Sequence, residues 1–284
     1  MTVKQTDLPC VRRAISVTSG QPTSDGAGVR LTRVIGQPRL PDLDPFLMLD
    51  EFRSDDARDY IAGFPDHPHR GFETVTYMLA GRMRHGDNKG HTGLLRPGSV
   101  QWMTAGRGIV HSELPEQEDG LMWGFQLWVN LPARDKMTAP RYQEIAPEDI
   151  PEVALDGGGR VRVVAGGFAG VEGPIGGIAT DPTYLDVSLP SGGRFAHRLP
   201  PLHSAFVYTF EGSAAIGTEE VGRGRIAVLS TGDRAEVEAP DGAARFLLVA
   251  GRPLREPVAK YGPFVMNTAD EIRQAIADYQ AGRF

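Results

Sequence analysis

The sequence of 284 residues contains one cysteine, Cys10. A single cysteine excludes an intramolecular disulfide and is typical of proteins from a reducing compartment. Positive charge is not in excess either, since the formal net charge is -6 at pH 7 and the pI is about 5.7. These values argue against direct binding to nucleic acid or to an anionic membrane surface.

Long hydrophobic runs are also missing. No apolar run reaches the roughly eighteen residues that a membrane span needs, and the first five residues lead into no apolar core of a signal peptide. We therefore expect a cytoplasmic protein without a membrane segment. Aromatic residues make up only 8% of the chain, whereas there are 35 glycines and 22 prolines, which favours many turns and short elements over long helices.

The first half of the chain has the pattern of an antiparallel β-barrel. Short runs rich in β-branched and aromatic residues alternate with turns that contain glycine or proline. These runs are residues 46–52, 71–81, 94–103, 106–111 and 121–129. The first His pair precedes the second run, and we expect that strand to continue into a hairpin at Gly81. Such a succession of short strands predicts a closed barrel.

The strand pattern breaks at residues 131–140, where two prolines and several charges predict a linker. The rhythm of short strands then resumes and predicts a second barrel; its strands are residues 161–166, 183–189, 205–210, 225–229 and 245–250. A chain of this length also favours two domains over one. We therefore expect one domain over residues 1–133 and another over residues 134–284.

The end of the chain departs from this pattern. Thr268 and Glu271 have the spacing of a capping box, and Ile272, Ile276 and Tyr279 follow at helical spacing. A short amphipathic helix is therefore predicted at the C-terminal end.

Two short motifs contain the best metal-ligand candidates. His67 and His69 are separated by one residue, as are His111 and Glu113, so each pair lies on one face of a β-strand. Three imidazoles and one carboxylate are a mixed nitrogen and oxygen set that suits divalent iron, nickel, copper, cobalt, manganese or zinc. Glu73 is a competing ligand, because it shares the strand parity of His67 and His69.

Other histidines fit the site less well. His85 and His91 fall in a polar hairpin region, where exposure to solvent is the default. In the second half, His197 and His203 form neither of the two motifs, which predicts a barrel without the metal ligands. We expect the large aromatic residues of the first half to be mainly core residues, namely Trp102, Trp123, Phe125 and Trp128.

Several long strings resemble the pirin family of bicupins. They are His67 to Tyr77 (HPHRGFETVTY), Gly90 to Gly93 (GHTG), Gln101 to Glu113 (QWMTAGRGIVHSE) and, near the end, Gly262 to Asn267 (GPFVMN). The resemblance is dense in the first half and sparse in the second. It implies an all-β chain of two cupin barrels in tandem, of the double-stranded β-helix or jelly-roll type, with a short C-terminal helix.

The resemblance also implies one mononuclear metal in the N-terminal barrel, held by His67, His69, His111 and Glu113. Cupins in general use a glutamate four residues after the two histidines, here Glu73, whereas proteins similar to pirin use the later glutamate. We favour Glu113, with Glu73 as a supporting residue or as a barrel residue that faces outward. We expect the metal to be Fe²⁺. Nickel, copper, cobalt, manganese and zinc suit the same ligands.

Some members of the family are quercetin 2,3-dioxygenases, which use O₂ to open the ring of a flavonol and release carbon monoxide. On that reading the substrate is a flavonoid-like enol, and Glu113, or Glu73 in its place, accepts the proton of the 3-hydroxyl group. The alternative is a non-enzymatic, iron-binding regulator, with a transcription factor or a metabolic enzyme as protein partner and the metal as a redox sensor.

Overall fold

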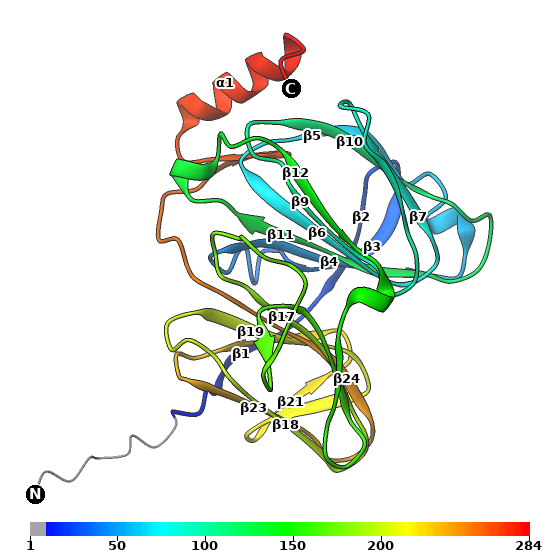
Figure 1. The fold of residues 1–284 in the computed structure, drawn as a ribbon, viewed down its shortest axis with the longest axis vertical. Coiled ribbons are helices and arrows are strands. Elements are labelled where there is room, and N and C mark those ends of the chain that lie inside the picture. Colours follow the sequence, from blue (N-terminus) through cyan, green and yellow to red (C-terminus); the bar gives the residue numbers. More distant parts are fainter. Residues whose placement is uncertain (1–9) are drawn as a thin grey trace, which may run out of the picture. The chain divides into compact units, whose positions relative to one another are not determined.

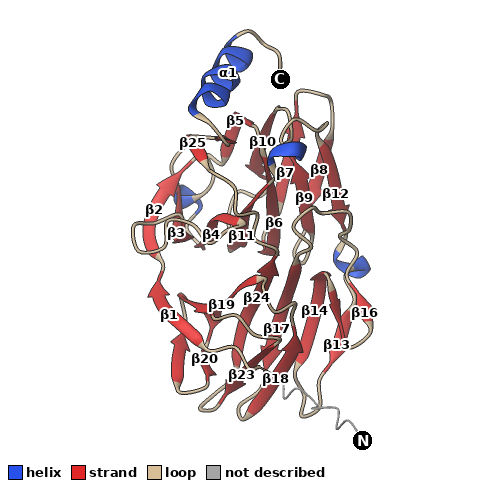
Figure 2. Cartoon of the chain, turned by 90° about the vertical axis from the view of Figure 1, so that its left-hand side faces the viewer, coloured by secondary structure: helices blue, strands red, loops and turns tan. Residues whose placement is uncertain are grey.

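The computed structural model describes residues 10–284, and its contacts divide the chain into two compact units. The smaller unit comprises the described part of Met1–Ser19, Glu152–Glu172 and Pro182–Pro253, and the larger unit comprises Gly20–Pro151, Gly173–Asp181 and Leu254–Phe284. Strands dominate both units (Figure 2). The predicted all-β chain with a C-terminal helix is confirmed.

The larger unit is built on two antiparallel sheets. Its strands are β2 (Gln21–Asp25), β3 (Val29–Ile35), β4 (Phe46–Ser54), β5 (Phe64–His69), β6 (Phe72–Ala80), β7 (Met83–Asp87), β8 (Thr92–Leu95), β9 (Val100–Thr104), β10 (Ile109–Pro115), β11 (Met122–Asn130), β12 (Arg141–Ile145), β25 (Ala259–Tyr261) and β26 (Phe264–Met266). The larger sheet has the order β12-β9-β6-β11-β4-β3-β2, and the smaller one β5-β10-β7-β8. Figure 1 shows β6, β9 and β11 side by side. Short 3₁₀ helices cover Ala57–Asp59, Ala133–Asp135 and Pro147–Asp149.

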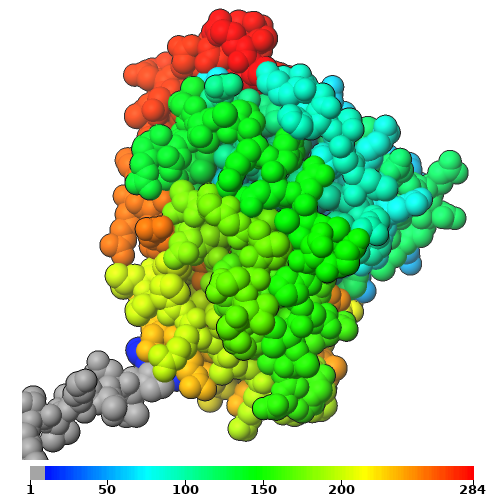
Figure 3. Space-filling model, in the orientation of Figure 1, coloured from blue at the N-terminus to red at the C-terminus, as the bar shows by residue number. Residues whose placement is uncertain are grey.

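The C-terminal segment belongs to the larger unit. Helix α1 (Ala269–Gln280) begins at the capping box of Thr268 and Glu271, as predicted, and buries Ile272 and Ala275 against Phe264 of β26. In the space-filling view this segment (red) lies directly against cyan and green residues of the same unit (Figure 3). Among residues 10–284, no helix has the length and apolar character needed to cross a membrane.

The smaller unit is likewise two antiparallel sheets. Its strands are β1 (Ala14–Ser19), β13 (Glu152–Ala154), β14 (Arg160–Ala165), β15 (Gly167–Phe168), β16 (Val171–Glu172), β17 (Thr183–Leu189), β18 (Gly193–Arg198), β19 (Ser204–Glu211), β20 (Ser213–Ile216), β21 (Glu219–Gly222), β22 (Arg225–Leu229), β23 (Arg234–Ala239) and β24 (Ala244–Gly251). The sheets have the orders β1-β22-β19-β24-β17-β14-β13 and β18-β23-β20-β21, and β15 pairs with β16.

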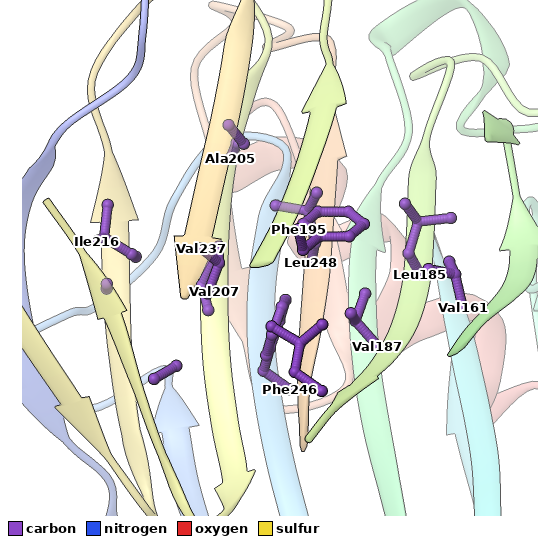
Figure 4. Close-up of a cluster of buried hydrophobic side chains, with 14 of the residues drawn as sticks. Val161, Leu185, Val187, Phe195, Ala205, Val207, Ile216, Val237, Phe246 and Leu248 are labelled. Atoms are coloured by element: carbon purple, nitrogen blue, oxygen red, sulfur yellow. The ribbon is translucent and has the colours of Figure 1, made fainter. Parts of the chain in front are cut away.

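Apolar side chains fill the interior of the smaller unit. Val187, Phe195, Val207, Phe246 and Leu248 are all buried in one cluster, and Figure 4 shows their side chains directed between the strands. Strand alternation explains the pattern, because every second residue of β17, β19 and β24 faces this interior. Burial of these side chains holds the two sheets of the smaller unit together.

The boundaries of the two units differ from the expected single division of the chain between residues 133 and 134. Long-range pairing explains the difference: β1 forms a ladder with β22, near the other end of the sequence, while the Val265 amide donates to the Arg70 carbonyl at 3.0 Å. Local strand patterns do not reveal which half each terminal segment joins. The terminal segments therefore group with the opposite half of the sequence.

Candidate metal centre

Three histidines meet on the inner face of the smaller sheet of the larger unit. In the antiparallel ladder of β5 and β10, His111 is paired with His67, and Ile109 with His69. Paired residues share a face, and so do residues two apart on a strand. One ring nitrogen from each of the three histidines lies within 4.8 Å of those of the other two. The two-residue spacing thus brings His67, His69 and His111 together, as the sequence predicts.

Burial keeps two of these imidazoles neutral. The exposed fraction is 2% for His69 and 1% for His111. Desolvation, followed by the neighbouring histidines, places the pKa of His69 and of His111 well below the ordinary value of 6.5. A neutral imidazole retains a lone pair, and a lone pair is what a metal ligand needs. The cluster is therefore ready to bind a cation near neutral pH.

Several histidine ring nitrogens of the cluster lack a hydrogen-bond partner within residues 10–284, which bears on whether a metal fits there. Both ring nitrogens of His111 are buried without a hydrogen-bond partner among the described residues, which costs about 1–3 kcal/mol for a buried polar group. His67 Nδ1 lies 2.8 Å from the Pro65 carbonyl, which places the proton on Nδ1 and leaves Nε2 free to bind; His67 Nε2 lies 3.0 Å from His69 Nε2. A divalent metal would satisfy these nitrogens, so the donor set fits one.

Glu113 faces the same interior as the histidines. It follows His111 by two residues on β10, and its exposed fraction is 2%. Gln126 Nε2 donates to Glu113 Oε2 at 3.0 Å, and the Thr76 hydroxyl lies 2.8 Å from Glu113 Oε1. The cluster of mutually close ligand atoms contains the histidines without Glu113. Thr76 and Gln126 therefore fix the orientation of the Glu113 carboxylate, which lies outside the close cluster of the three imidazoles.

Glu73 points to the other face of its strand. The Thr104 hydroxyl donates to Glu73 Oε1 at 2.7 Å, whereas Thr76, three residues further along β6, contacts Glu113. Residues three apart on a strand lie on opposite faces. The expected common parity of Glu73 with His69 is wrong, because β5 ends at His69 and β6 begins at Phe72 in a different sheet. Burial is the main cause that raises the pKa of Glu73.

The expectation of solvent exposure holds for one of the two hairpin histidines. The His91 side chain is 64% exposed and contacts Asp87. His85 is buried instead, because it is the residue paired with Glu113 in the ladder of β7 and β10 and so faces the interior. His85 Nε2 lies 2.8 Å from Glu144 Oε1, and this contact is the main cause that lowers the pKa of Glu144.

A pocket of about 610 Å³ opens beside the cluster, lined by His67, His69 and Glu113 at one end. Its apolar wall comprises Leu31, Met48, Phe52, Phe64 and Trp128. The sequence indicated core positions for most of the four aromatic residues; Trp102, Trp123 and Phe125 are buried, whereas Trp128 is half-buried and lines the pocket. The sequence reasoning also missed Gln126, although it lies two residues before Trp128 on β11.

The smaller unit has no counterpart of this site among its described residues. The histidine cluster of the larger unit is the one group of three or more potential ligands found in residues 10–284. His197 lies among Phe168 and Phe195, and His203 is buried in a different segment. The absence of metal ligands from the second barrel stays a prediction.

Two antiparallel strand units, one with a histidine cluster facing its interior, define the class of the bicupins. The family models agree: residues 28–129 match that of Pirin, and residues 184–284 match that of the Pirin C-terminal cupin domain. A pirin-like protein of Caulobacter vibrioides is 54% identical, with 96% of this chain and 99% of that protein covered. The chain therefore belongs to the pirin family.

Solved structures support the same fold. Quercetin 2,3-dioxygenase from Acinetobacter baumannii is similar with a TM-score of 0.89 at 34% identity, with 96% of this chain and 98% of that chain covered. A bacterial pirin from Escherichia coli, solved in complex with nickel(II), has a TM-score of 0.66 at 17% identity over 84% of this chain and 99% of that one. The second likeness concerns the fold alone.

Proposed function

We propose that this protein is a metal-dependent dioxygenase that opens the ring of a flavonol-like enol with O₂. The observation that carries the proposal is the cluster of His67, His69 and His111 at the end of an apolar pocket. The pocket volume of about 610 Å³ suits a small aromatic molecule. The similarity to a quercetin 2,3-dioxygenase supports this choice of reaction.

The three histidines would hold the metal, Fe²⁺ being our first choice, and Glu113 is our proposal for the fourth ligand. When bound, a divalent metal supplies a Lewis acid that favours ionisation of a substrate hydroxyl and gives access to redox chemistry with O₂. Glu113 is also placed to accept the hydroxyl proton, because it lines the pocket and its carboxylate is oriented by Thr76 and Gln126.

The apolar wall would orient the substrate. Trp128 packs against His69, with ring centroids 5.3 Å apart, and it also lines the pocket. A flat ring stacked along Trp128 would therefore have one edge at the histidines. Phe52 and Leu31 add apolar surface that excludes water around the bound ring.

The test uses three samples of the protein, loaded with iron, with nickel or with copper. Each sample is incubated with quercetin in air. We expect loss of the flavonol absorbance and release of carbon monoxide with at least one metal. His69→Ala should lose both the bound metal and turnover. Turnover without bound metal would overturn the proposed mechanism, and tight metal binding without turnover of any flavonol would favour the regulatory alternative.

A further inference from the structure

The pocket has a second polar end, remote in sequence from the histidines. Lys260, on strand β25 of the C-terminal segment, lines the pocket together with Arg33 and Asp50. Its Nζ lies 5.1 Å from the centroid of the Trp128 ring, and the same tryptophan contacts His69. Trp128 thus contacts both His69 and Lys260, so a pocket ligand beside this ring would reach the histidines and the ammonium.

The two positively charged residues of the pocket lining, Arg33 and Lys260, differ in whether they are already paired with a carboxylate. Arg33 donates to Asp50 Oδ1 at 3.0 Å and to Asp50 Oδ2 at 2.8 Å, and it also contacts Asp25 at 2.8 Å. The Arg33 guanidinium is therefore already paired with two carboxylates. The Lys260 ammonium forms no hydrogen bond or ion pair within residues 10–284, although it lines the same pocket.

The Lys260 side chain is exposed to solvent at the pocket, and its ammonium lies over the Trp128 ring. No carboxylate is bonded to it within residues 10–284, so an anion in the pocket can approach it. An accessible ammonium that no carboxylate pairs can form a charge-assisted hydrogen bond with an anionic oxygen. The Lys260 end of the pocket therefore favours a negatively charged group over a neutral one.

We propose that Lys260 is an anion-binding subsite that selects planar aromatic ligands with a carboxylate or phenolate on the ring farthest from the histidines. The ligand would lie along Trp128, with its enol at the histidine end and its anionic oxygen at Lys260. This orientation rests on the proposed function, whereas the preference for an anion rests on Lys260 alone. Of the acidic groups near Lys260, Asp50 and Asp25 are bonded to Arg33, and Asp42 does not line the pocket.

The test compares three ligands that differ at one position: 3-hydroxyflavone, its 4′-carboxylate and its 4′-trimethylammonium derivative. Binding to iron-loaded protein is measured without oxygen by calorimetry. We expect the 4′-carboxylate to bind about tenfold more tightly than 3-hydroxyflavone, because one additional charge-assisted hydrogen bond increases affinity by about that factor. Lys260→Gln should reduce this ratio to about one, and Lys260→Arg should restore most of it.

Lys89→Gln is the matched control, because Lys89 contacts the Phe284 carbonyl and does not line the pocket; it should keep the tenfold ratio. Acetylation of the lysines, followed by mass spectrometry, gives a second readout: the carboxylate should protect Lys260 and leave Lys89 reactive. Equal ratios in wild type and Lys260→Gln, or tighter binding of the cationic derivative, would overturn the subsite.

The two proposals fail in different ways. Aerobic turnover of 3-hydroxyflavone with no preference for the carboxylate refutes the Lys260 subsite and leaves the dioxygenase intact. Lys260-dependent binding of the carboxylate without consumption of O₂ refutes the dioxygenase and leaves the subsite. If none of the three flavonols binds, both proposals are overturned.

Discussion

Two side chains, Thr76 and Gln126, orient the carboxylate of Glu113. The Thr76 hydroxyl lies 2.8 Å from Glu113 Oε1 and 2.7 Å from Gln126 Oε1, yet it has one proton to donate. The hydroxyl and the Gln126 amide together fix the orientation of Glu113. Groups that orient a metal ligand in this way commonly change metal affinity when they are removed.

Thr76→Val tests this orientation with little change in shape. If Glu113 is the fourth ligand, we expect metal affinity to fall about 10- to 100-fold, measured by competition with a chromophoric chelator. Thr104→Val is the control, because its hydroxyl contacts Glu73 on the opposite face of β6, and it should leave metal affinity unchanged. The reverse result would assign the ligand role to Glu73.

The sequence predicted the residues of the cluster better than their surroundings. His67, His69, His111 and Glu113 form local motifs, and a two-residue spacing is sufficient to place each pair on one face. Lys260 and Gln126 carry no such local signal, since only the tertiary structure brings β25 and β11 to the pocket. The orientation of Glu73 failed for a related reason, because strand parity holds only while a strand is continuous.

At the scale of elements, a corner between β5 and β6 separates the histidine strand from the strand of Glu73. Gly71 has a φ of +88°, and a Cβ there would collide with the Val265 carbonyl oxygen, so glycine is required. The buried Lys136 ammonium secures the corner by donating to the Gly71 carbonyl at 2.8 Å and to the Val265 carbonyl at 2.9 Å. A single glycine within a β-rich run is not a sufficient local signal that the strand ends there.

Lys136→Met should destabilise the larger unit. The substitution leaves two buried carbonyls and the Asn130 side-chain oxygen without their donor, and we expect the free energy of unfolding to fall by about 2–4 kcal/mol at pH 7. Urea denaturation, followed by a probe within the larger unit, measures the change. Lys89→Met is the control, and equal stability of Lys136→Met and wild type would show that the contacts of Lys136 contribute little.

The same pair of proteins gives a pH test. Burial lowers the pKa of Lys136 to about 8 from the ordinary 10.5. Between these two pH values the unfolded chain holds a proton on Lys136 that the folded chain has released, so stability rises with pH across this window. The free energy of unfolding of wild type minus that of Lys136→Met should therefore grow by about 1–3 kcal/mol from pH 8 to pH 10. A constant or shrinking difference would contradict the lowered pKa.

At the scale of the whole molecule, the two units should respond differently to metal. A ligand at 100 times its dissociation constant stabilises the folded state by about 2.7 kcal/mol, and the histidine cluster belongs to the larger unit. We expect added Fe²⁺, under anaerobic conditions, to slow hydrogen exchange in β5 and β10 and to leave β17 and β24 unchanged. His111→Ala should abolish the effect, and equal protection in both units would contradict a single site in the larger unit.

The overall architecture was accessible from sequence because strand alternation and glycine turns recur through both halves. The grouping of the terminal segments was not, because the ladder of β1 with β22 joins residues more than two hundred positions apart. No periodicity within either segment encodes that pairing. Local patterns therefore predicted the kind of element, and long-range contacts decided which unit each end of the chain completes.

The pairing of His67 with His111 on adjacent strands also bears on how such a centre is gained or lost in evolution. Side chains alternate along a strand, so one codon inserted between Gly108 and His111 would turn both His111 and Glu113 outward at once wherever no bulge absorbs the extra residue. A single mutational step would thus remove two side chains from the site, although the gene would still encode all of the ligand residues. Duplicated barrels can thus diverge into one that binds metal and one that does not, and a census of ligand residues that ignores strand register would miss the loss.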